Sequence, residues 1–244
     1  MSIANSPLKR AAEMSPCAKA RMAGIFEALE GVASSQGQVF ILGKFVIAGG
    51  AAATAANVFG HERFYWLGFG ISLAGVAFHV AWVALFYELF EIVNRSLSLV
   101  SAFVGLVTCG LQALTAFLYL APLLILQSGN AVGALTTAQL QDLALIFFKL
   151  NSCAFDVDLV FFGAWCALAG YLILKSEFMP RILGALLMID GVGWMMFAHP
   201  PLALRIFPLI AAASGLAEIP MQLWLIIMGV NAEKWRQQAS AAAE

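Results

Sequence analysis

Ionisable side chains near the middle of long apolar segments are the residues of this sequence best suited to chemistry. His79, Asp158, Asp190 and Glu218 lie in four separate segments of this kind. A charge at the centre of a bilayer costs about 2.5–3.5 kcal/mol on insertion scales, so such residues usually face a protein interior and serve a function. We therefore expect these four side chains to meet inside a helical bundle.

Asp156 is a further candidate of the same kind. At about 100° per residue, Asp156 and Asp158 point about 200° apart on one helix, so they cannot both face one cavity. Lys149 lies on the same helical face as Asp156, about 10 Å along the axis, and is its candidate partner.

A polar stripe runs along the first apolar segment. Glu27, Glu30, Ser34 and Gln38 are three or four residues apart, so they share one face of a helix. We expect this face to point away from lipid. It would bring Glu27 and Glu30 to the acidic site and let Ser34 line a pocket there.

Two tryptophans lie about one helical turn from candidate site residues. Trp82 follows His79, and Trp194 follows Asp190. Both indole rings are candidates to line a pocket beside the acidic site, although packing in the core is the more frequent role of such residues.

Few basic side chains lie at the depth of these carboxylates, and His79 is one of them. A buried carboxylate without a basic partner either holds a proton or binds a cation. The hypothesis is an acidic site near the middle of the membrane, balanced by protons, a metal ion or a cationic ligand. Taken alone, each side chain has a simpler interpretation as a hydrogen-bonding contact between helices. The sequence leaves the cofactor and the metal open.

The composition requires lipid as the surrounding solvent. Of 244 residues, 62% are hydrophobic and 11% are charged, and the mean hydropathy is +0.88. Soluble domains contain about 45–50% apolar and about 25% charged residues. We expect an all-α, polytopic transmembrane helix bundle of about six spans. The expected spans are 22–43, 65–91, 97–127, 143–174, 182–199 and 206–231.

The distribution of Lys and Arg predicts the orientation. Positive residues collect on the cytoplasmic side of a membrane. With alternating spans and a cytoplasmic amino terminus, this side receives Lys9, Arg10, Lys19, Arg21, Arg95, Lys175, Arg181, Lys234 and Arg236, and the other side receives Lys44, Arg63, Lys149 and Arg205. We therefore expect both termini in the cytoplasm. The domains are then a basic tail over 1–19, a membrane domain over 20–232 and a second tail over 233–244.

A short Gly- and Ala-rich segment, residues 49–61, separates the first two expected spans. A longer first span that included it would place Lys44 in the middle of the membrane, which is costly. We therefore expect an external or re-entrant helix in this segment.

Several motifs connect the chain to a known family. The two most specific are AAATAAN at 51–57 and PRILG at 180–184. Supporting motifs are His61-Glu62, Tyr87-Glu88-Leu89, Val93-Asn94-Arg95, Phe161-Phe162-Gly163, Gly170-Tyr171-Leu172 and Lys175-Ser176. With them the chain resembles, from about Ala20 to Val230, a large bacterial family of six-helix membrane proteins catalogued only as a domain of unknown function.

The resemblance implies a fold and a bacterial cytoplasmic (inner) membrane location, but no chemistry. The sequence departs from the family pattern at Asp156, Asp158 and Asp190, where apolar or small residues are expected. This departure suggests a specialised member of the family.

Three functions remain open. The first is a binding or transport protein whose carboxylates and His79 bind a cation, a proton or a small ligand. The second is a membrane-embedded enzyme that acts on a lipid or isoprenoid substrate by acid catalysis. The third is a structural or regulatory subunit of a membrane complex. The expected partners are the lipid bilayer and a small-molecule or cationic ligand. A net charge of -1 argues against nucleic acid as a partner.

Overall fold

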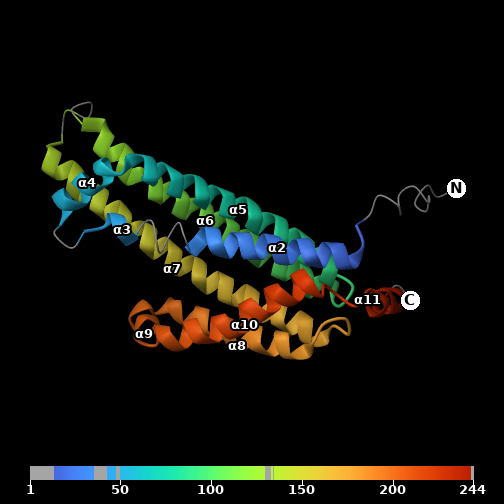
Figure 1. Cartoon of the computed structure of the whole chain (residues 1–244). Helices are drawn as coiled ribbons and strands as arrows, with labels where there is room; N and C mark the ends of the chain where they lie inside the picture. The colour runs from blue at the N-terminus through green and yellow to red at the C-terminus, as the bar shows by residue number, and fades with distance from the viewer. Residues whose placement is uncertain (1–13, 36–42, 48–49, 130–132, 134, 243–244) are drawn as a thin grey trace.

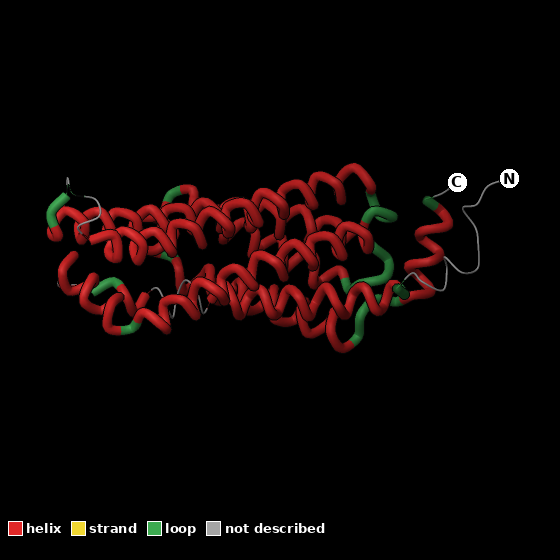
Figure 2. The backbone as a smooth tube through the Cα atoms, turned by 90° about the horizontal axis from the view of Figure 1, so that it is seen from above, coloured by secondary structure: helices red, strands yellow, loops and turns green. Residues whose placement is uncertain are grey.

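The computed structural model describes residues 14–35, 43–47, 50–129, 133 and 135–242. Within these ranges the regular structure is helical throughout. Figure 1 shows an elongated bundle in which α2, α5, α6 and α7 run along the long axis, and Figure 2 shows the same elongation from above. The fold class is therefore the expected all-α bundle.

The chain enters the bundle through α2, Pro16–Ser34. Ser15 caps this helix by accepting a hydrogen bond from the Ala18 amide at 3.2 Å, and Pro16 occupies its first turn. α2 begins six residues before the expected span, and residues 36–42 of that span lie outside the described residues. Gln38 and the basic residues Lys9 and Arg10 lie outside them as well.

Two short helices follow at the far end of the bundle, α3 (Gly43–Phe45) and α4 (Ala51–Gly60). Gly50 precedes α4 with a φ of 102°, which glycine adopts without steric cost. Asn57 ties the two helices together by donating to the Lys44 carbonyl at 2.7 Å and the Phe45 carbonyl at 3.2 Å. A separate helix thus forms within the segment 49–61, as expected.

Three long helices form the centre of the bundle: α5 (Glu62–Phe90), α6 (Arg95–Ser128) and α7 (Thr137–Lys175). Asn94 caps α6 through the Leu97 amide at 2.9 Å, and Thr136 opens α7 with a capping box completed by Gln139. At about 1.5 Å per residue, α7 measures about 58 Å, whereas a bilayer core is about 30 Å thick. These helices must tilt or extend beyond the lipid.

The chain then forms a shorter hairpin beside α7. It comprises α8 (Arg181–Met195), the 3₁₀ turn η4 (Met196–Ala198), α9 (Pro200–Arg205) and α10 (Phe207–Ile227). A last helix, α11 (Ala232–Ala241), docks at the amino-terminal end of α2, where the described chain begins (Figure 1). The indole of Trp235 anchors α11 by donating to the Leu89 carbonyl at 3.0 Å.

Glycine brings α7 and α8 into backbone contact. A Cβ atom at Gly163 would lie 2.5 Å from the Gly191 carbonyl oxygen, and one at Gly170 would lie 2.6 Å from that of Gly184. Small residues of this kind allow transmembrane helices to approach closely and pack through their backbones. The α7–α8 pair is thereby fixed, and Asp190 lies beside one of its contact points.

Five described helical segments are long and apolar enough to cross a membrane: α5, α6, α7, α8 with η4, and α10. They coincide with the last five expected spans, so the chain is a multi-pass membrane protein. Its outer surface carries many exposed apolar side chains, including Phe103, Phe117 and Leu209, which is typical of a surface that contacts lipid. α2 carries four charged residues in its described part, and the total of six spans stays a prediction.

Candidate functional site

His79 is the centre of a buried hydrogen-bond network between α5 and α6. The imidazole is 1% exposed. The Thr108 hydroxyl donates to the Gly105 carbonyl at 2.6 Å, so its oxygen accepts from Nε2 of His79 at 2.8 Å. On the other side of the ring, Nε2 of Gln112 donates to Nδ1 of His79 at 3.0 Å. This pattern places the imidazole proton on Nε2 and leaves Nδ1 as the acceptor.

Gln112 extends the network to α2. The second hydrogen of its amide nitrogen donates to Oε1 of Glu30 at 2.8 Å, and that oxygen lies 3.6 Å from Nδ1 of His79. Glu30 is 7% exposed. A carboxylate, an amide, an imidazole and a hydroxyl therefore form one continuous chain, in which a rotation of the Gln112 side chain would let Nδ1 of His79 face Glu30 directly.

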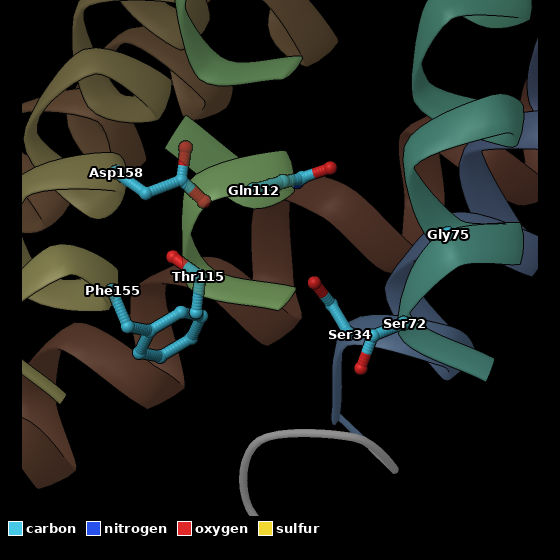
Figure 3. A pocket seen from close by; sticks show the side chains of 7 residues that line it. All are labelled: Ser34, Ser72, Gly75, Gln112, Thr115, Phe155 and Asp158. Carbon is cyan, nitrogen blue, oxygen red and sulfur yellow. The ribbon is translucent and has the colours of Figure 1, made fainter. Parts of the chain in front are cut away.

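Asp158 lines a small cavity next to this network (Figure 3). The cavity has a volume of about 20 Å³, and Ser34, Ser72, Gly75, Gln112 and Thr115 also line it. Phe155 closes it from α7. Asp158 is 3% exposed, and its Oδ1 has no hydrogen-bond partner. The cavity thus holds an unpartnered carboxyl oxygen in the interior of the protein.

A second acidic group lies between α8 and α10. Asp190 is 0% exposed and faces Glu218 closely enough to interact with it electrostatically. Glu218 accepts hydrogen bonds at Oε1 from the Trp194 indole at 3.0 Å and from the Ser214 hydroxyl at 2.8 Å. Neither carboxyl oxygen of Asp190 lies in hydrogen-bonding geometry with a described partner. Glu218 is therefore held as an acceptor by two donors, and Asp190 is buried beside it.

The described part of α2 connects the two acidic groups. Glu27 and Glu30 are one turn apart, and both are buried. Glu27 interacts electrostatically with Glu30 and with Glu218, and Glu30 interacts with Asp158. The carboxyl groups therefore form an extended row from α7 across α2 to α10 and α8, whereas the sequence predicted a single convergent site. The members of this row are Asp158, Glu30, Glu27, Glu218 and Asp190.

Positive charge is scarce in this interior. None of the described Lys or Arg side chains is buried, and Glu27, Glu30, Asp158 and Asp190 are buried beside a partly buried Glu218. His79 is the single buried histidine of the described chain. An ionised row would therefore carry several negative charges against one imidazole, and it needs protons or bound cations for balance.

The remaining candidates occupy different places. Asp156 is partly exposed, and in the described structure no ion pair joins it to the exposed Lys149. Ser34 lines the cavity as expected. Trp82 and Trp194 do not line it: the Trp82 ring packs 4.9 Å from His79 between ring centroids, and Trp194 bonds Glu218. Among the described residues no three His, Cys, Asp or Glu side chains are placed to hold one metal ion.

The sequence analysis missed the contribution of α6. Thr108, Gln112 and Thr115 supply the network and the cavity, and Ser72 contributes from α5. The spacing of four and then three residues places the α6 side chains on one face of an otherwise apolar helix. A polar stripe of uncharged residues, treated like the stripe on α2, would have identified them.

Comparisons with known proteins give a family but no activity. A search of curated proteins finds no match, and a search of solved structures finds none either. A family model described as "Domain of unknown function (DUF4386)" matches residues 22–229. This confirms the resemblance to a family of unknown function, and the match covers most of the chain, so the protein belongs to the DUF4386 family.

Proposed function

We propose that this protein binds and relays protons through the buried row of acid groups in its helix bundle, as a cation-binding or transport protein of the membrane. The carrying observation is the charge balance of the interior. The interior contains four buried carboxyl groups, the partly buried Glu218 and one buried histidine, and no Lys or Arg side chain of the described chain is buried. Intramembrane carboxylates that lack a basic partner typically mark proton or ion pathways.

The network around His79 supports proton transfer in particular. Nδ1 of His79 and Oε1 of Glu30 are 3.6 Å apart, and both share the amide hydrogens of Gln112. An imidazole can accept a proton at one nitrogen and release it from the other, which makes it an effective shuttle. The small cavity beside Gln112 and Asp158 has room for a water molecule that would extend the path.

A role as an enzyme acting on a lipophilic substrate finds less support in the geometry. Pockets for small molecules usually measure about 300–1,000 Å³. The cavity at Asp158 measures about 20 Å³ and cannot admit a lipid. A larger hollow of about 610 Å³ lies on the surface from Phe59 to Trp66, and none of the candidate site residues lines it.

A purely structural role also fits less well. Carboxyl groups that only join helices are bonded to a neighbouring helix. Oδ1 of Asp158 and both oxygens of Asp190 have no such bond, although Glu218 does. Three carboxyl oxygens of these two acid groups therefore lack the bond to a neighbouring helix that a purely structural role would give them.

We also propose the bacterial cytoplasmic membrane as the location, with both termini in the cytoplasm. The described chain ends lie at one end of the bundle (Figure 1). Arg95, Lys175 and Arg181 are terminal residues of α6, α7 and α8 at that end, where the positive-inside rule expects the cytoplasmic face.

The test is proton flux in vesicles containing the purified protein. A pH gradient is imposed, and a pH-sensitive dye inside the vesicles reports its decay. Wild-type vesicles should lose the gradient faster than empty ones, and His79→Gln should slow the decay by about 100-fold, the effect of a lost proton-transfer group. His61→Gln is the matched control, because His61 is exposed at the start of α5.

Two results would overturn the proposal. One is a wild-type rate equal to that of empty vesicles. The other is a His79→Gln protein that is folded and conducts protons as fast as the wild type.

A further inference from the structure

Three polar side chains that line the Asp158 cavity, those of Ser72, Gln112 and Thr115, donate their hydrogens elsewhere. The Ser72 hydroxyl donates to the Gly68 carbonyl at 3.0 Å, and the Thr115 hydroxyl donates to the Leu111 carbonyl at 2.8 Å. The amide hydrogens of Gln112 serve Glu30 and His79. Ser72 and Thr115 therefore offer lone pairs to the cavity.

Asp158 adds a carboxyl oxygen to this set of acceptors. Oδ1 of Asp158 has no partner, the side chain is 3% exposed, and in Figure 3 its carboxyl group points toward Gln112 and Thr115. Glu30 lies close enough to Asp158 to add negative potential. A cavity lined by acceptors and held at negative potential favours a positively charged occupant over a neutral one.

Size and charge narrow the choice of cation. A volume of about 20 Å³ holds an occupant about as large as one water molecule. One lining carboxylate balances one positive charge. Ca²⁺ takes six to eight oxygen ligands and Mg²⁺ keeps several waters, whereas the side chains that line this cavity offer one carboxylate and three hydroxyl groups. A small monovalent cation with an affinity for oxygen ligands fits these limits.

We propose that this cavity binds one sodium ion, with the Asp158 carboxylate and the hydroxyl oxygens of Ser72, Thr115 and Ser34 as its ligands. The four side chains come from α7, α5, α6 and α2, so the ion would connect four helices (Figure 3). This inference rests on the proposed function, in which the interior binds protons or other cations, and it names sodium as a cation that binds there besides the proton.

The experiment measures the thermal stability of the purified full chain in detergent. The melting temperature is compared in NaCl, KCl and choline chloride at equal ionic strength. Sodium at about 100 times its dissociation constant should raise the Tm by about 5–10 °C. Asp158→Asn and Thr115→Val should abolish the sodium-specific shift.

Asp156→Asn is the matched control, because Asp156 lies two residues away on the same helix, is partly exposed and does not line the cavity. This variant should keep the shift. If Asp158→Asn does not fold, Thr115→Val and Ser72→Ala decide the question.

The inference would be overturned if sodium did not raise the Tm of the wild type specifically, because the cavity would then hold only water. It would also be overturned if the Asp158→Asn and Thr115→Val variants kept the sodium-specific rise in Tm, or if Asp156→Asn lost it. His79→Gln distinguishes this inference from the proposed function: His79 does not line the cavity, so this variant should keep the sodium-specific rise in Tm while it loses proton flux. A sodium shift without proton flux overturns the proposed function alone, and flux without a sodium shift overturns the sodium site alone.

Discussion

The contact between α7 and α8 can be tested by adding one methyl group. In Gly191→Ala, the new Cβ atom would lie 2.5 Å from the Gly163 carbonyl oxygen and 2.9 Å from the Ala167 amide nitrogen. A comfortable separation between carbon and carbonyl oxygen is about 3.3–3.6 Å. The two helices would have to separate by about 1 Å, because the opposing atoms belong to the backbone and cannot rotate away.

Overpacking of this kind typically costs about 1–3 kcal/mol. For a chain of this size, each kcal/mol lowers the Tm by about 2–4 °C, so we expect a decrease of about 2–12 °C in thermal unfolding of the purified protein. Gly193→Ala is the matched control on the same helix. A Cβ atom there would meet Ile210 at 3.5 Å, an ordinary contact, and alanine favours the helix over glycine by about 1 kcal/mol.

We therefore expect Gly193→Ala to leave the Tm unchanged or to raise it. An unchanged Tm in Gly191→Ala, or equal decreases in both variants, would refute the interpretation of the α7–α8 contact as a backbone-to-backbone interface.

Two further predictions concern polar contacts and use the same unfolding measurement. Gln112→Leu removes the donor to both Glu30 and His79, and each buried unsatisfied group costs about 1–3 kcal/mol. The control is Gln127→Leu on the same helix as Gln112, which removes an exposed hydrogen bond to Glu62 of α5 and should cost much less. Equal losses of stability in the two variants would contradict this prediction. Lys19→Ala breaks the 2.6 Å ion pair with Glu88, whose side chains are 22% and 46% exposed, so it should cost less than about 1 kcal/mol; a larger loss would show a buried role for Lys19.

The sequence was sufficient to predict the membrane helices, because their signal is local. Twenty or so consecutive apolar residues identify a span without reference to any neighbour. The last five expected spans correspond to helices for this reason. The first span is weaker in sequence, since Glu27 and Glu30 interrupt it.

The arrangement of the candidate site was predicted only in part, because the sequence gives depth along a helix but not rotation or neighbours. Asp190 and Asp158 are buried as expected, yet Asp190 meets Glu218 while Asp158 faces the cavity beside Gln112. The helical angle between Asp156 and Asp158 predicted that they would not both face one cavity, and Asp158 alone of the two lines the cavity. Which helix lies opposite each face is a tertiary property, and periodicity alone cannot supply it.

The position of Glu27 and Glu30 on one helix has a thermodynamic consequence. Side chains three residues apart on a helix lie about 6 Å from each other, and two charges at that distance interact by about 3 kcal/mol at an effective dielectric constant of about 20. The two glutamates therefore repel each other when both are ionised. Linkage makes this effect reciprocal, so occupancy near Asp158 and occupancy near Asp190 would oppose each other through α2. If the row carries protons, as proposed above, loading one end of it would favour release at the other.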